Sequence, residues 1–91
     1  MTRDELMQTL AGYTISVEYE ASAPGAYMGR GWKHKSFPGD QFREAQNFAN
    51  THGATGCEIY DSHGHFSQKI FDGYWKMVRQ VKSMDETRER G

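Results

Sequence analysis

The fold is decided first by one strictly alternating stretch, residues 13–20, which reads YTISVEYE. Apolar side chains occupy every second position, at Tyr13, Ile15, Val17 and Tyr19, and polar or acidic side chains lie between them. Because successive side chains of a strand point to opposite faces, this pattern predicts a strand with one buried and one exposed face. A strand of this kind needs a sheet around it and a layer that covers its apolar side.

Helical patterns precede and follow this strand. Thr2 and Glu5 have the spacing of a capping box, which predicts a short helix that ends at Gly12. Asp40 is the expected N-cap of a second helix, which ends at Gly53. The apolar positions of this second helix recur at helical spacing, and they are Phe42, Ala45, Phe48 and Ala49.

A third, amphipathic helix is predicted after Asp72 and Gly73. Its apolar residues fall on one face: Tyr74, Met77, Val78, Val81 and Met84. We interpret this stripe chiefly as core, although Trp75 beside it would also suit an interface or a dimer seam. Residues 85–91 alternate acids and bases without apolar anchors, so we expect them to fray.

Three further strands complete the predicted sheet. Residues 32–37 follow a connection rich in glycine, and a strand is expected around 57–60. The turn residues 61–64 then predict a hairpin into a fourth strand at 65–71. The resulting order is α-β-β-α-β-β-α. We predict the α+β class, with a four-stranded antiparallel sheet and a central helix on one face, in a single domain 1–91.

Composition limits the classes of protein that the chain can belong to. Its 91 residues suffice for one domain. Eleven basic and twelve acidic side chains give a net charge of −1, so the total charge does not indicate a polyanionic partner. The single cysteine, Cys57, excludes an intramolecular disulfide framework and fits a reducing compartment. We expect no secretory signal and no membrane anchor, and hence a cytoplasmic location.

The most unusual segment is residues 27–35, which reads YMGRGWKHK. No acid occurs from Ser22 to Gly39. Cations there could contact phosphate, and aromatic faces could stack on bases or on a partner's side chains. The candidate binding residues are Tyr27, Arg30, Trp32, Lys33, His34 and Lys35. The alternative is a solvated edge strand that its lysines protect from aggregation, with Trp32 in the core.

Metal and catalytic sites have weaker sequence signals. The candidate metal ligands are His52, Cys57, His63 and His65, but neither CxxC nor HxxxH spacing occurs. The acids that could form a carboxylate pair are Asp40, Glu44, Glu58 and Asp61, and capping, turn formation and solvation explain them better. No nucleotide-binding loop or nucleophile elbow is present. We therefore predict no catalytic residue, no metal, no cofactor and no enzyme activity.

Residues 42–49, FREAQNFA, are followed by GATGCEIYD at 53–61 and then by Gly64. This part of the chain resembles the helix-then-hairpin half of many tiny proteins encoded by phages and mobile elements, among them some anti-CRISPR inhibitors. The resemblance implies a stoichiometric inhibitor without enzyme activity that occludes a protein or ribonucleoprotein complex in the cytoplasm of a bacterial host. Inhibitors of this kind that imitate nucleic acid are strongly acidic, whereas this chain is near neutral.

Two functions are therefore expected from the sequence. The first is a small protein-binding module, an inhibitor of a nucleic-acid-handling complex, that uses the candidate residues of segment 27–35. The alternative is a protein that binds nucleic acid directly through the same segment. Both a monomer and a homodimer fit the sequence.

Overall fold

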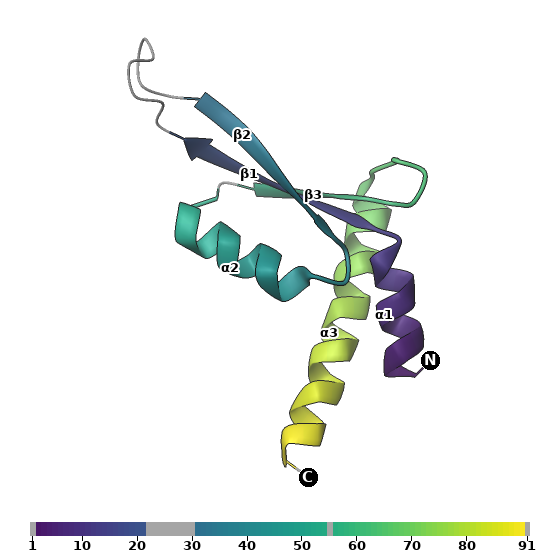
Figure 1. Ribbon diagram of the computed structural model, residues 1–91. Coiled ribbons are helices and arrows are strands. Elements are labelled where there is room, and N and C mark those ends of the chain that lie inside the picture. Colours follow the sequence, from purple (N-terminus) through teal and green to yellow (C-terminus); the bar gives the residue numbers. More distant parts are fainter. Residues whose placement is uncertain (1, 22–30, 55, 91) are drawn as a thin grey trace.

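The computed structural model describes residues 2–21, 31–54 and 56–90, with the side chains of all of these except 21, 31, 32 and 88–90 (Figure 1). Its α+β class confirms the prediction. The elements follow in this order: α1 (Arg3–Ala11), β1 (Thr14–Ala21), β2 (Gly31–Pro38), α2 (Phe42–His52), β3 (Gly56–Tyr60) and α3 (Gln68–Arg90).

The sheet has three strands in the order β2-β1-β3, with β1 in the centre and antiparallel to both neighbours. Ile15 of β1 lies opposite Phe37 of β2 and Ile59 of β3. The strands β2 and β3 are therefore parallel to each other, and α2 connects them past β1. Figure 1 shows that α2 and α3 cover the same side of the sheet and that α1 lies beside α3.

The predicted fourth strand is wrong. Residues 65–67 are irregular, and α3 begins at Gln68. Ser67 starts this helix, because its Oγ accepts a hydrogen bond from the Ile70 backbone N–H at 3.2 Å and its carbonyl accepts one from Phe71 at 2.9 Å. The expected hairpin turn is instead a loop closed by Asp61. The Asp61 carboxylate accepts the backbone N–H groups of His63 and His65, each at 2.9 Å.

Two helix ends agree with the sequence, whereas the starts of α2 and α3 differ from it. Both halves of the Thr2–Glu5 capping box are present, and Gly53 ends α2 in a left-handed conformation with φ 59°. The N-cap of α2, however, is Gln41 and not Asp40, and it makes no side-chain capping bond. Gly73 lies inside α3 and not in a turn before it, because the apolar stripe continues backwards from Tyr74 to Ile70 at helical spacing.

The hydrophobic core lies between the sheet and the three helices. The stripe of α3 contributes Tyr74, Val78 and Val81 as fully buried residues, which confirms that it is core. Each other element except β2 adds one or two buried apolar residues: Leu6, Leu10, Ile15, Val17, Phe42, Ala45 and Ile59. The Tyr74 hydroxyl donates a buried hydrogen bond of 2.7 Å to the Gly39 carbonyl, which ties the turn after β2 to α3.

An ion-pair network fixes the C-terminal part of α3 to the other two helices. The Asp85 carboxylate lies 2.6 Å from Nε of Arg3 in α1 and 3.0 Å from Nη2 of Arg43 in α2. These two arginines hold the pKa of Asp85 below its usual range. The helix thus includes residues 85–90 of the tail for which we expected fraying, and Asp85 joins all three helices.

Candidate binding surface

The structure places three of the six predicted binding residues in full. Lys33, His34 and Lys35 are exposed on β2, which is an edge strand of the sheet. Trp32 also belongs to β2, where it is paired with Glu20, but its side chain lies outside the described part of the chain. Tyr27 and Arg30 lie outside the described residues.

The strand register separates these three residues onto two faces of the sheet. Residues directly opposite each other in an antiparallel pair share a face. Lys33 and Lys35 lie opposite Tyr19 and Val17 of β1, on the side that the helices cover. His34 lies opposite Glu18 on the other side, where its Nε2 is 3.6 Å from the Glu18 carboxylate. Among the residues whose side chains the structure describes, Lys33 and Lys35 therefore lie on one face of the sheet and His34 on the other.

The two lysines join a group of rings from β1, β2 and α2. Phe48 of α2 is the centre of this group, with Tyr19 at 5.0 Å and Phe37 at 5.6 Å in edge-to-face geometry. The His52 ring stacks on Phe48 at 4.0 Å, and the ammonium of Lys35 lies 5.9 Å from the Phe37 ring centre. We call this surface the β2–α2 patch, and it consists of Tyr19, Lys33, Lys35, Phe37, Phe48 and His52.

Helix geometry fixes His52 within this patch. His52 follows Phe48 by four residues, so the two side chains are neighbours on α2. The His52 Nδ1 also lies 3.0 Å from the Phe48 carbonyl oxygen. Sequence reasoning assigned Phe48 to the core and considered His52 as a metal ligand. Because the pairing of Lys33 with Tyr19 depends on strand register, no local pattern revealed that these residues meet.

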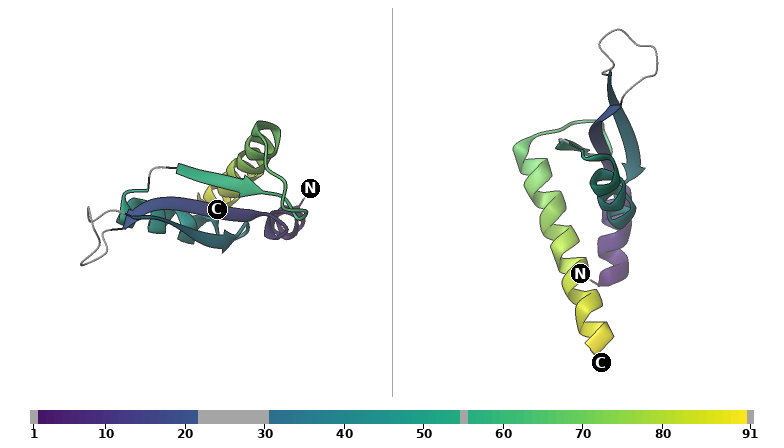
Figure 2. Two further views of the ribbon diagram at one scale, coloured as in Figure 1. Left: turned by 90° about the horizontal axis from the view of Figure 1, so that it is seen from above. Right: turned by 90° about the vertical axis from the view of Figure 1, so that its left-hand side faces the viewer.

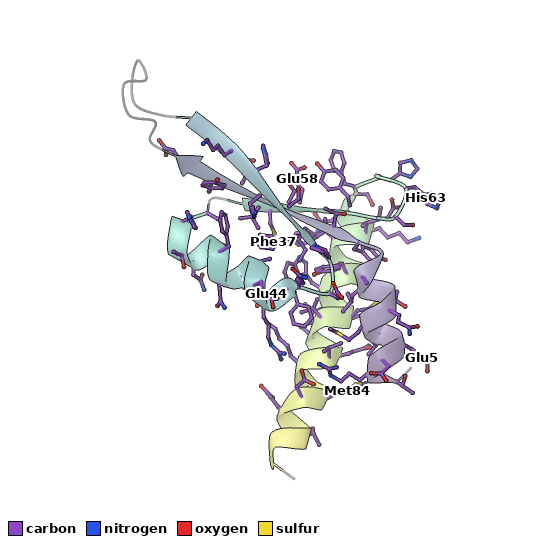
Figure 3. The ribbon with its side chains drawn as sticks, in the orientation of Figure 1. Glu5, Phe37, Glu44, Glu58, His63 and Met84 are labelled. Carbon is purple, nitrogen blue, oxygen red and sulfur yellow. The ribbon has the colours of Figure 1, made fainter. Side chains whose placement is uncertain are left out.

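The opposite face of the sheet carries carboxylates. Figure 3 shows Glu58 projecting away from the helices, whereas Phe37 lies on the helix side. The Tyr60 hydroxyl donates a hydrogen bond to the Glu58 carboxylate, which raises the pKa of Tyr60. The Tyr60 ring also meets Phe66 edge to face at 5.3 Å. With Glu18 on the same face, this side of the sheet differs in charge from the lysines of the β2–α2 patch.

The four candidate metal ligands serve other contacts. His63 and His65 lie in the loop that Asp61 closes, with ring centres 6.2 Å apart, and His52 belongs to the β2–α2 patch. Cys57 is half-buried on β3, and burial raises the pKa of its thiol. Within residues 2–21, 31–54 and 56–90, no three His, Cys, Asp or Glu side chains are placed to hold a metal ion.

We also searched the helices for a membrane span and compared the chain with known proteins. No helix among the described residues is both long enough and apolar enough to span a membrane. No family model, no curated protein and no solved structure matches the chain. The interpretation of the surface therefore depends on its own chemistry.

Proposed function

We propose that the protein is a small binding module without enzyme activity, and that a partner protein docks on the β2–α2 patch. The observation that carries the proposal is the grouping of two exposed lysines with four rings on one side of an edge strand. Aromatic side chains supply large contact area at low entropic cost, and flanking cations add orientation.

The exposure of the patch suits an interface. Tyr19, Phe37 and Phe48 are partly buried, so their positions are fixed before a partner arrives. The side chains of Lys33 and Lys35 are exposed around them. A fixed aromatic centre with a polar rim is the usual anatomy of a protein–protein interface.

Charge favours a protein over a nucleic acid as the partner. The patch has two lysines, Lys33 and Lys35. If each contacted one phosphate, the logarithm of the binding constant would fall with the logarithm of the salt concentration with a slope of only about −2. Binding would then fall only about tenfold between about 50 and 200 mM salt, because few counterions are released. Direct binding of nucleic acid, with Arg30 as a further cation, is the alternative function.

The resemblance to anti-CRISPR inhibitors adds a class of target. We propose that the partner is a host protein or ribonucleoprotein complex that handles nucleic acid, and that the module blocks it stoichiometrically. Tyr27, Arg30 and Trp32 stay predicted contact residues, because they lie within the six residues that precede Lys33. His34 is assigned a separate role in the pair with Glu18.

The test is a pull-down from bacterial lysate with and without nuclease, using three forms of the chain. These are the wild type, the double variant Lys33→Glu/Lys35→Glu, and the control Lys69→Glu/Lys76→Glu, which changes the same charge on exposed residues of α3. We expect a nuclease-resistant protein partner that the patch variant loses and the control retains. Recovery of nucleic acid alone, abolished by nuclease, would favour the alternative function. Equal recovery by both variants would refute the role of the patch.

A further inference from the structure

Two adjoining hollows follow one flank of α3, away from the β2 edge of the sheet. The first has a volume of about 350 Å³ and lies beside the edge strand β3, where Cys57 and Ile59 line it together with Phe66 and Phe71. The second, of about 460 Å³, lies between α2 and α3 and is lined by Gln46, Phe71, Asp72, Trp75 and Arg79. Phe71 lines both, so the hollows form one strip along the helix.

The strip has an aromatic centre that the chain itself covers only in part. Phe71 and Trp75 are four residues apart on α3, and their rings meet edge to face at 6.1 Å. Both are half-buried, and Phe66 at one end of the strip is 63% exposed. The indole Nε1 of Trp75 is buried without a hydrogen-bond partner among the described residues. Exposed aromatic surface of this kind is typical of an interaction site.

The charges of the strip lie on both sides of Trp75, with Asp72 three residues before it and Arg79 four residues after it. Asp72 and Arg79 are both exposed and are seven residues apart, which corresponds to about 10 Å along a helix. One oxygen of Asp72 accepts a hydrogen bond of 2.8 Å from Gln68. Arg79 has no ion pair or hydrogen bond with any described residue. Counting only contacts within the described part of the chain, the strip therefore contains one carboxylate with a free oxygen and one guanidinium without a partner.

We infer that this strip binds a second copy of the chain, with the two α3 helices antiparallel and a two-fold axis beside Trp75. In that arrangement each Asp72 lies opposite Arg79 of the other copy, and the two Trp75 rings approach each other at the axis. A two-fold interface must be complementary to itself. A strip with an acid on one side of its apolar centre and a base on the other meets this condition, whereas a strip of one charge sign would need a different partner.

The inferred dimer goes beyond the proposed function and does not depend on it. Figure 2 shows α3 on one side of the molecule and β2 on the other. Dimerisation through the α3 flank would leave the lysines of both β2 strands accessible. The dimer would then present two copies of the β2–α2 patch, and a target with two sites would bind it more tightly than a monomer.

A charge-swap experiment tests the inference, with mass in solution measured by sedimentation velocity over a range of protein concentrations. The wild type is expected to show a monomer–dimer equilibrium. Asp72→Arg and Arg79→Asp each place like charges opposite each other twice in the homodimer, so each alone should associate at least about tenfold more weakly. Mixed in equal amounts, the two variants restore both opposite-charge pairs, and a heterodimer should form.

The controls separate this result from misfolding and from general charge effects. Both substituted side chains are exposed, so each variant should keep the circular dichroism spectrum of the wild type. Lys69→Glu changes charge on an exposed residue of α3 that lines neither hollow and should leave the equilibrium unchanged. A wild type that stays monomeric at millimolar concentration, or a dimer that neither reversal weakens, would overturn the inference. The Lys33→Glu/Lys35→Glu variant should still dimerise, which keeps this test independent of the proposed function.

Discussion

The two edge strands of the sheet, β2 and β3, are protected against unwanted strand pairing in different ways. The β2 edge is eight residues long, and Lys33, His34 and Lys35 are exposed along it. The β3 edge has only five residues, and Phe71 of α3 lies beside it, together with Phe66 from the loop before α3. Charge and a short length are both known protections against unwanted strand pairing. Here the charged β2 edge belongs to the β2–α2 patch, on which we propose that a partner docks. The short β3 edge adjoins the strip on α3 that we infer to be the dimer interface.

The edges also differ in how their ends are held. Pro38 ends β2, and the Gly39 that follows it lies against the C-terminal end of α1. Its N–H donates a hydrogen bond of 2.8 Å to the carbonyl of Tyr13, between α1 and β1. Gly56 begins β3 with open space around it. The position of the β3 edge depends instead on α3, which the ion pairs of Asp85 tie to α1 and α2. Substitutions at these places should therefore have very different effects on stability.

Gly39→Ala should have the largest effect. A Cβ at this position would lie 2.0 Å from the Leu10 carbonyl oxygen and 2.8 Å from Cβ of Tyr13, so backbone must move. We expect a loss of about 3 kcal/mol in the free energy of unfolding, measured by urea denaturation. Gly56→Ala is the matched control, with no atom within 4 Å of the added Cβ, and should stay within about 0.5 kcal/mol of the wild type. Equal losses in both variants would contradict the asymmetry of the two edges.

Asp85→Asn should have an intermediate effect that depends on pH. The folded-state pKa of Asp85 is lowered, first by the hydrogen bond from Arg3. The stabilisation is therefore complete above the unfolded pKa of about 3.9 and is lost as the pH falls through the lower folded value. We expect the variant to melt several degrees below the wild type at pH 7 and the two melting curves to converge in strong acid. A difference in melting temperature that persists unchanged at pH 2 would show that Asp85 acts by packing alone.

Gly73→Ala should have the smallest effect, and it should be stabilising. Gly73 is exposed inside α3, and a Cβ there meets no atom within 4 Å. Alanine in a helix interior is favoured over glycine by about 1 kcal/mol, so the melting temperature should rise by a few degrees. A destabilised variant would indicate that Gly73 is needed for close contact with another chain. Sedimentation velocity on the same variant would then test whether it still dimerises.

Local patterns were sufficient for most of the fold. The alternation from Tyr13 to Tyr19 predicted β1, the Thr2–Glu5 pair predicted the start of α1, and Gly53 predicted the end of α2. These features depend on a few neighbouring residues and on backbone chemistry that does not change with tertiary context. For residues 65–71, local patterns gave a wrong prediction. Phe66 and Ile70 suggested a strand, but Ser67 caps a helix whose apolar face continues from Ile70 into Tyr74.

The sequence by itself determined the class of the fold, the apolar stripe of α3 and the exposed cations around residue 33. Tertiary structure alone decided which side chains share a surface. Strand register placed Lys33 and Lys35 beside Tyr19 and Phe37 and sent His34 to the opposite face. Helix packing brought Gln46 of α2 to the same hollow as Trp75. Contacts between residues distant in the chain depend on register and on packing angles, and no short segment of sequence specifies either one.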